Sequence, residues 1–299
     1  MNLLEDVQRL GDGIYSKIKD HDVVADVLPD VALAALDTSA VVPQLTWQNL
    51  ADVVATAGAL PLQGTGGIGD PPVTLYRSPG DAFYIEALMH SSASMAIHDH
   101  NFSGAFAVVS GDCAHQVYDY ETDDPSGELT IGELTPTTSE PLFTGACRPI
   151  HNGTGLIHRN LHLDRPTVTV VVRTVWDGGR THIYQESGLA LDTHQTPVER
   201  KQIQFLAGLL RFDEAAALRY LEQVLATTTR IGHAYRCVDL FVRRTDRWDD
   251  LDRLLLLAKH IFGQRTAAVG QALRRVPELD PVVVELLNAR RQAATSAPN

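Results

Sequence analysis

Residues 97–111 read IHDHNFSGAFAVVSG and combine two histidines with an apolar run that stops at a turn glycine. Because side chains alternate along a β-strand, His98 and His100 lie on the same face of one strand. Two imidazoles placed in this way can chelate a single metal ion. Farther along the chain the segment GLIH supplies a third imidazole, His158, at the start of another expected strand. These three histidines are therefore the candidate metal ligands.

The sequence between these two motifs is rich in histidine. Half of the chain's 12 histidines fall within residues 98–162. Outside a motif, exposure is the commoner fate of a polar residue of this kind. We therefore expect His115, His151 and His162 on the surface, the last of them in a loop.

The sequence around the motifs has the pattern of many short strands. Turn clusters such as GTGGIGDPP and DDPSGE separate apolar runs such as AFYIEALM, HQVYDYE and PTVTVVVRT. Short strands with frequent turn signals, and no helical pattern between them, indicate an antiparallel sandwich or barrel. We place this barrel at residues 61–195.

Helical patterns precede and follow the barrel. The opening segment MNLLEDVQRLGDGIYSKI has apolar residues at three- and four-residue spacings, and Thr46 is suited to cap a helix that ends at Gly58. After the barrel, several short amphipathic segments persist to the end of the chain. The sequence thus predicts a helical preface at 1–60 packed on the barrel, the barrel at 61–195, and an all-α domain at 196–299.

Composition excludes several classes of protein. A chain of 299 residues, 44% apolar and 21% charged, is typical of a soluble globular protein with more than one domain. It contains no run of about twenty apolar residues, and acids interrupt its first turns, so neither membrane insertion nor secretion is expected. Three cysteines without a CxxC pair predict neither a disulfide framework nor a thiolate zinc site. A reducing, cytoplasmic location fits this pattern.

Charge is unevenly distributed along the chain. The net charge of −12 argues against binding of nucleic acid, which needs a basic surface. Residues 1–195 hold 9 Lys and Arg against 25 Asp and Glu, whereas residues 196–299 hold 16 against 12. The opposite signs predict that the helical domain docks on the barrel or builds a homodimer. A packing domain without a role in turnover is the alternative.

The order of motifs, HxH, strand, turn glycine and then Gly-x-x-His, resembles the two motifs of the cupin superfamily. The resemblance covers about residues 61–190 and implies an antiparallel jelly-roll barrel that holds a metal ion inside. Cupins usually carry a glutamate four or five residues after the second histidine, but Gly104 and Ala105 stand there in this chain. Three neutral imidazoles leave the charge of a divalent ion uncompensated and about three coordination positions open, which suits anionic substrates and O2.

The stretch LYRSPGDAFYIEALMHSSASMAIHDHNFSG resembles the cysteine dioxygenase type of thiol dioxygenase more closely. This resemblance implies an iron(II) ion held by the three histidines, and a substrate carboxylate held by Arg77. A planar guanidinium suits that role because it donates two parallel hydrogen bonds. The segment that begins at His158, His-Arg-Asn-Leu-His, also looks like the third-ligand segment of that family.

The strand TVTVVVRT departs from the thiol dioxygenase pattern. The Ser-His-Tyr relay of that family falls on Thr169, Val171 and Arg173, so its acid and its phenol are missing. Arg173 stands in an otherwise apolar strand, and a buried arginine needs a partner. It either pairs with a barrel carboxylate such as Glu86 or binds an anionic substrate.

The resemblance therefore implies a mononuclear non-heme iron(II) dioxygenase that adds O2 to a small anionic substrate, such as a thiol amino acid, without an organic cofactor. Two alternatives remain open. The barrel can be a ligand-binding or sensor module without turnover, or a dioxygenase that cleaves a diketone at the same iron. A diketone needs an apolar pocket and no carboxylate anchor, so the role of Arg77 separates that reaction from thiol oxidation.

Overall fold

The computed structural model describes residues 3–64, 72–91, 96–123, 127–175, 180–274, 284–285 and 288. Contacts divide the chain into two compact units, which are described separately. The barrel unit contains Met1–Asp119 and Thr135–Arg180, and the helical unit contains Tyr120–Leu134 and Thr181–Glu278. None of the helices in the described ranges has both the length and the apolar character needed to cross a bilayer.

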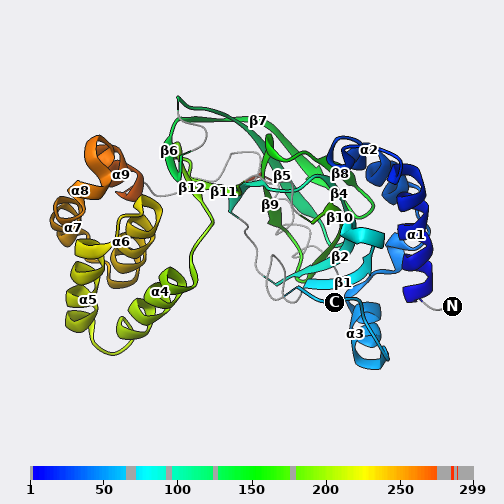
Figure 1. The fold of residues 1–299 in the computed structure, drawn as a ribbon, viewed down its shortest axis with the longest axis horizontal. Coiled ribbons are helices and arrows are strands. Elements are labelled where there is room, and N and C mark those ends of the chain that lie inside the picture. Colours follow the sequence, from blue (N-terminus) through cyan, green and yellow to red (C-terminus); the bar gives the residue numbers. More distant parts are fainter. Residues whose placement is uncertain are drawn as a thin grey trace. The chain divides into compact units, whose positions relative to one another are not determined.

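The barrel unit begins with helices that cover one sheet. They are α1 (Leu3–Ile18), α2 (Val24–Asp37), the 3-10 turn Val42–Gln44 and α3 (Trp47–Thr56). Thr46 caps α3 by accepting a hydrogen bond from the Asn49 amide, as the sequence predicts. Helices α1 and α2 bury one apolar side each, and together with the outer residues of the sheet these form one core. Helix α2 lies along strands β4 (Gly104–Ser110) and β8 (Cys147–Ile150), whereas α1 contacts β1 (Pro72–Arg77) (Figure 1).

Helix α1 approaches strand β1 closely at Gly11. A Cβ atom at this position would lie 2.6 Å from ring atoms of Tyr76, so a larger residue cannot be accommodated without a shift. The Tyr76 hydroxyl donates a hydrogen bond to Asp12 Oδ1 over 3.0 Å. This contact fixes the helical preface on the sheet through a residue pair far apart in sequence.

Two antiparallel sheets face each other in the barrel unit. The first has the strand order β1 (Pro72–Arg77), β2 (Phe83–His90), β10 (Thr167–Thr174), β4 (Gly104–Ser110) and β8 (Cys147–Ile150). The second includes β3 (Ile97–His100), β9 (Gly153–His162), β5 (Cys113–Glu121) and β7 (Glu133–Leu142), in that order. Strands β2 to β5 alternate between the sheets, and so do β7 to β10; β10 is inserted between β2 and β4, and β9 between β3 and β5. This is the double-sheet jelly roll of cupins, and it confirms the predicted fold class.

Alternation along β2 separates the helix-covered core from the interior of the barrel. Ile85 and Ala87 belong to the core under α1 and α2. Their neighbours Glu86 and Leu88 line an internal cavity. Because the side-chain period of a strand is two, the same strand supports both the core and the cavity.

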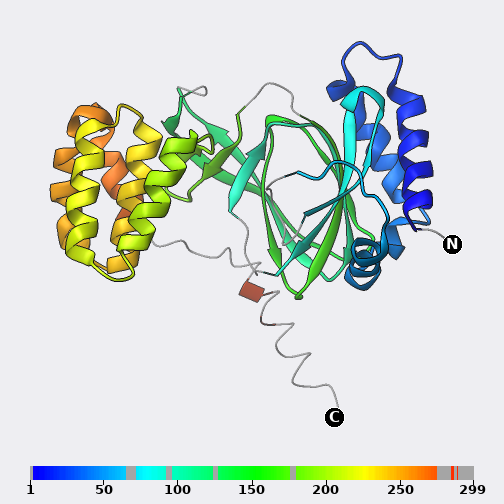
Figure 2. The ribbon, with the colours of Figure 1, turned by 60° about the horizontal axis from the view of Figure 1, so that its bottom comes forward.

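The helical unit combines three short strands with a set of helices (Figure 2). Strands β6 (Leu129–Ile131), β12 (Leu189–Asp192) and β11 (His182–Tyr184) pair in that order. The helices are α4 (Pro197–Leu209), α5 (Glu214–Thr227), α6 (Ile231–Thr245), α7 (Leu251–Leu257), α8 (Lys259–Phe262) and α9 (Thr266–Arg274), with 3-10 turns at Trp248–Asp250 and Gly263–Arg265. Leu129, Leu189 and Leu191 share one core with the helices.

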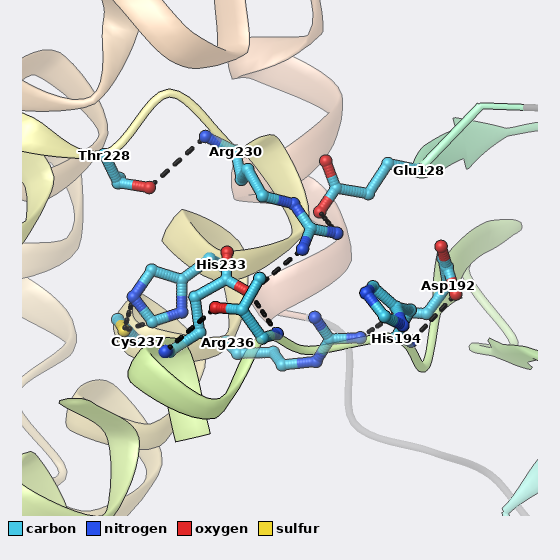
Figure 3. Close-up of polar contacts among 10 residues, drawn as sticks. Glu128, Asp192, His194, Thr228, Arg230, His233, Arg236 and Cys237 are labelled. Atoms are coloured by element: carbon cyan, nitrogen blue, oxygen red, sulfur yellow. Dashed lines mark hydrogen bonds and ion pairs between the residues drawn. The ribbon is translucent and has the colours of Figure 1, made fainter. Parts of the chain in front are cut away.

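Ion pairs also connect these strands with the helices. Arg230 lies 2.7 Å from Glu128 and 2.9 Å from Glu199, and so joins the start of β6 to α4 (Figure 3). Glu199 also accepts a hydrogen bond from the backbone amide of Thr196, in a capping box at the start of α4. Arg236 donates to the backbone carbonyl of Asp192 at the end of β12. The strands and helices of this unit are therefore held by both apolar and polar contacts.

Candidate metal centre

The structure brings the three histidines of the two motifs together inside the barrel. His98 and His100 come from β3, and His158 comes from the adjacent β9, where it is the register partner of His98. Their ring centroids lie 4.8 to 4.9 Å apart, which makes a nearly equilateral triangle. One nitrogen from each ring lies within 4.8 Å of the others, and all three residues are buried. This group could hold a metal ion.

Hydrogen bonds determine which ring nitrogens remain for a cation. Nδ1 of His98 lies 2.9 Å from the Ala96 carbonyl, and Nδ1 of His158 lies 2.9 Å from Nε2 of His115. In both rings Nε2 is the nitrogen left for a metal. Ligand histidines usually bind their second nitrogen to another group in this way, which fixes the ring orientation.

Burial keeps these imidazoles neutral. Desolvation lowers the pKa of His98, and it lowers the pKa values of His100 and His158 well below the usual range, with a further contribution from the neighbouring histidines. A neutral imidazole has a free lone pair, which a metal ligand needs. The cluster is therefore ready to bind a cation without first losing protons at neutral pH.

The packing of β4 excludes a carboxylate from the position at which cupins carry their glutamate. A Cβ atom on Gly104 would lie 1.9 Å from the Val172 carbonyl oxygen, so even alanine would clash with the backbone of β10. Ala105 is fully buried in the core on the helix-covered side of the sheet. The absence of a fourth, anionic ligand from these two positions is thus enforced by the sheet itself.

A cavity of about 190 Å³ adjoins the three histidines. Its other polar lining residues are Thr74, Arg77, Tyr84, Glu86, His90, Asn160, Thr169 and Arg173. Its apolar lining residues are Leu88, Phe102, Phe106, Ile150, Val171 and Val175. A small molecule that enters this space meets the metal-binding nitrogens and a cationic side chain in mostly apolar surroundings.

Arg173 is held between two aromatic rings in this cavity. Its guanidinium carbon lies 4.1 Å from the centroid of Phe102 and 4.8 Å from that of Tyr84. Phe102 also contacts His100, with ring centroids 4.8 Å apart, so one aromatic ring separates the guanidinium from a ligand histidine. Nε of Arg173 is buried and has no hydrogen-bond partner in the described part of the chain. Such a group is expected to bind an anion or water.

Arg77 lines the same cavity, but its guanidinium already forms an ion pair with Asp81. Its Nε donates to Asp81 Oδ1 over 2.9 Å, and this hydrogen bond raises the pKa of Arg77 further. Its guanidinium lies 5.5 Å from the Tyr84 ring. Both predicted arginines therefore reach the cavity near Tyr84, and within the described residues Nε of Arg173 has no hydrogen-bond partner.

Glu86 is an unusual acid for an apolar interior. Burial raises its pKa, and the nearby positive charge of Arg173 opposes this rise. Burial likewise raises the pKa of Tyr84. The effect of the Arg173 charge on Glu86 agrees with the expected pairing of these two residues. The position of Arg173 in the cavity lining agrees with the other expected role, which is to bind an anionic substrate.

Two histidines that the sequence places on the surface are buried. His115 is 2% exposed and His162 is 3% exposed, so the prediction was wrong for both, whereas His151 is exposed as expected. His162 belongs to β9 and not to a loop, and because it is four residues after His158 it shares the interior face. The pairing of β5 with β9 places His115 on that face too.

Sequence reasoning also missed His90, at the end of β2. Its Nε2 lies 3.1 Å from the Thr169 hydroxyl, and its ring stacks on His162 with centroids 4.0 Å apart. Nδ1 of His162 in turn lies 3.3 Å from Cys113 Sγ. Thr169, expected to mark only the loss of a relay, thus has an imidazole partner from another strand. The position of His90 at the edge of an apolar run gave no signal of this contact.

Comparisons with known proteins find structural similarity only at low TM-scores. No family model matches the chain, and no curated protein matches it. A protein from Klebsiella pneumoniae with a double-stranded beta-helix domain is similar over 41% of this chain and 84% of its own, at 12% identity and a TM-score of 0.26. A structure of DMSP lyases matches over 61% and 98%, at 15% identity and 0.34. A hydroquinone 1,2-dioxygenase matches over 34% and 61%, at 16% identity and 0.26. At such scores the fold assignment depends on strand order alone.

Proposed function

We propose that this protein is a mononuclear non-heme iron(II) dioxygenase that adds O2 to a small anionic substrate, such as a thiol amino acid. The observation that carries the proposal is the position of Arg173, one aromatic ring away from the ligand His100 in the same cavity. A substrate whose anionic group binds this guanidinium extends directly toward the three imidazoles. Small anionic substrates therefore fit the cavity better than an uncharged diketone does.

The residues of the chain have distinct roles in this reaction. His98, His100 and His158 hold the cation as neutral nitrogen ligands. Iron(II) in that position supplies the redox chemistry for O2, because three neutral ligands leave coordination positions open for substrate and oxygen. Arg173 binds and orients the anionic group, and its stacking between Tyr84 and Phe102 restricts its rotation.

The apolar lining residues exclude water from the cavity. Leu88, Ile150 and Val171 form part of the cavity surface. Removal of water strengthens the attraction between the guanidinium and an anion, because the effective dielectric constant falls. Arg77 lies near the same end of the cavity and adds positive charge there.

Oxygen uptake by the iron-loaded protein tests the proposal. The purified full chain is loaded with one equivalent of iron(II) under nitrogen and mixed with small thiols, amino acids, hydroxy acids and diketones in an oxygen electrode. We expect one O2 consumed per molecule of an acidic substrate, with a product heavier by two oxygen atoms in mass spectrometry. A ligand-binding module would bind a compound without oxygen uptake or a change in its mass, and that result would reject the enzymatic assignment.

Glu86 favours a second candidate, an oxygen-independent lyase. This half-buried carboxylate lines the cavity and has a raised pKa, which suits a base that removes a proton from a bound acid while a leaving group departs with its electron pair from the adjacent carbon. The same panel is therefore run without O2. Product formation under nitrogen that disappears in Glu86→Gln would identify the lyase and exclude the dioxygenase.

A further inference from the structure

His158 differs from the other two candidate ligands in what lies behind it. Its Nδ1 lies 2.9 Å from Nε2 of His115 on the adjacent strand β5. Nδ1 of His115 in turn lies 3.2 Å from Glu140 Oε1 on β7. Arg148 on β8 donates from Nε to Glu140 Oε1 over 2.9 Å and from Nη2 to Oε2. We call His158, His115, Glu140 and Arg148 the histidine–carboxylate chain.

With Glu140 ionised and His115 neutral, the hydrogen bonds of the histidine–carboxylate chain allow only one arrangement of protons. Arg148 is always a donor, so both oxygens of Glu140 accept, and the hydrogen bonds from Arg148 lower the pKa of Glu140. The ionised Glu140 then accepts the proton carried by Nδ1 of His115. Since His115 is buried and neutral, its Nε2 has a lone pair and must accept a hydrogen bond from His158. His158 therefore carries its proton on Nδ1 and has its lone pair on Nε2.

We propose that His115 and Glu140 are positioning residues, which hold His158 with its lone pair on Nε2 and increase its basicity as a ligand of the metal centre. This inference rests on the proposed metal site and deepens it. The carboxylate that packing excludes at Gly104 is thereby replaced by one located two hydrogen bonds behind a ligand. His98 is instead supported by a neutral group, because its Nδ1 lies 2.9 Å from the Ala96 carbonyl oxygen.

The histidine–carboxylate chain also connects the buried metal centre with the surface of the barrel. His158 and His115 are almost fully buried, whereas the Glu140 and Arg148 side chains are 29% and 35% exposed. A purely structural set of polar contacts would stabilise the barrel without any effect on the metal. A positioning role instead changes the protonated nitrogen of His158, the metal affinity and the geometry of the bound ion. These three quantities can be measured.

The position of the proton is tested first, in metal-free full-length protein with 15N-labelled histidine. Long-range 1H–15N correlation spectra distinguish an imidazole protonated on Nδ1 from one protonated on Nε2. We expect both His158 and His115 to carry the proton on Nδ1 at neutral pH, with the signals assigned by their loss in the His158→Asn and His115→Phe variants. A proton on Nε2 of His158 would overturn the proposal, whether or not the protein binds metal.

Metal affinity is tested second, with cobalt(II) and a competing chelator. His115→Phe keeps an aromatic ring beside Phe106 but removes both nitrogens, so affinity should fall by about 10- to 100-fold. Glu140→Gln keeps the shape and removes the charge, and should lower affinity severalfold with a shift in the visible cobalt spectrum. The matched control is His162→Phe, a buried histidine on the same strand as His158, which should stay within about twofold of the wild type.

The two variants keep the outcomes distinguishable. If His115→Phe does not fold, Glu140→Gln alone decides the matter through the affinity and the cobalt spectrum. Metal affinities of the folded variants equal to that of the wild type would show that the histidine–carboxylate chain is only structural, and would overturn the proposal. Failure of the wild type to bind cobalt, zinc or iron would reject the proposed function instead, while the nitrogen spectra would still report the position of the proton.

Discussion

The polar groups around Arg230 in the helical unit and the polar groups of the cavity in the barrel unit are arranged differently. In the helical unit, Arg230 contacts the carboxylates of both Glu128 and Glu199, so the charges compensate one another. In the barrel unit, three imidazoles converge without an acid among them, and Nε of Arg173 has no hydrogen-bond partner among the described residues. The first arrangement is expected to stabilise the fold. The second leaves binding capacity unused by the protein, and that capacity is what a ligand can use.

The largest expected effect is the loss of metal from the barrel when one ligand is removed. In His98→Ala, two imidazoles cannot retain an ion at a site built for three, so iron content should fall from about one equivalent to less than about a tenth. Turnover should disappear with it. Metal analysis after gel filtration measures the loss, and Arg230→Met serves as the control that keeps its metal. Near-stoichiometric iron in His98→Ala would end the metal-site assignment.

The helical unit should lose stability without loss of metal when its shared cation is removed. Arg230→Met leaves Glu128 and Glu199 without their common partner, and we expect unfolding in urea to become easier by about 2 kcal/mol. Arg253→Met is the matched control, because Arg253 forms an exposed pair with Glu222, and exposed pairs contribute about 0.5 kcal/mol or less. Equal effects of the two substitutions would contradict the comparison between the units.

Acid should destabilise the barrel through its buried neutral histidines. Burial, with a smaller contribution from His90, lowers the pKa of His162 to about 3. His162 therefore takes up a proton near pH 6.5 in the unfolded chain but stays neutral down to about pH 3 in the folded chain. Its contribution to the free energy of unfolding is fully present above about pH 6.5 and is lost as the pH falls toward 3. Between pH 7 and 5, His162 should account for about 2 kcal/mol of the loss. Urea unfolding of metal-free wild type and His162→Phe measures this share. The free energy of unfolding of His151→Asn, changed at an exposed residue, should depend on pH as that of the wild type does. The same dependence on pH in His162→Phe would refute the prediction.

The smallest expected effect is a difference in KM between substitutions of the two arginines of the cavity. Arg173→Lys keeps the charge but loses the planar guanidinium, so KM for an acidic substrate should rise about tenfold while iron content stays unchanged. Arg77→Lys should raise KM by only about twofold, because Asp81 already engages this side chain. Steady-state oxygen uptake measures both. A larger effect at Arg77 would make it the anchor, as the thiol dioxygenase resemblance implies.

Local patterns in the sequence predict the fold and the three converging histidines. The spacing in His98-Asp-His100 fixes two imidazoles on one strand face, and Gly-x-x-His158 marks the start of the strand that pairs with it. Turn clusters and short apolar runs are likewise local, so the jelly roll follows from them. These features need no knowledge of which strands are neighbours.

Contacts between strands far apart in sequence were beyond such patterns. His115 reaches His158 because β5 pairs with β9, and Glu140 reaches His115 from β7, which lies beside β5 in the sheet. His90 reaches Thr169 because β2 pairs with β10. A single sequence contains no record of these registers, so each histidine resembled a surface residue when taken alone.

The contact at Gly104 also limits how the protein can change. A change from glycine to glutamate at this position would drive a side chain into the Val172 carbonyl oxygen, 1.9 Å from the first added atom. The β10 backbone would have to move first, and β10 carries Arg173 and pairs on both sides with other strands. A carboxylate ligand at this position would therefore require several compensating changes in β10. A strand that supplies no metal ligand thus restricts which side chains can stand beside the metal centre.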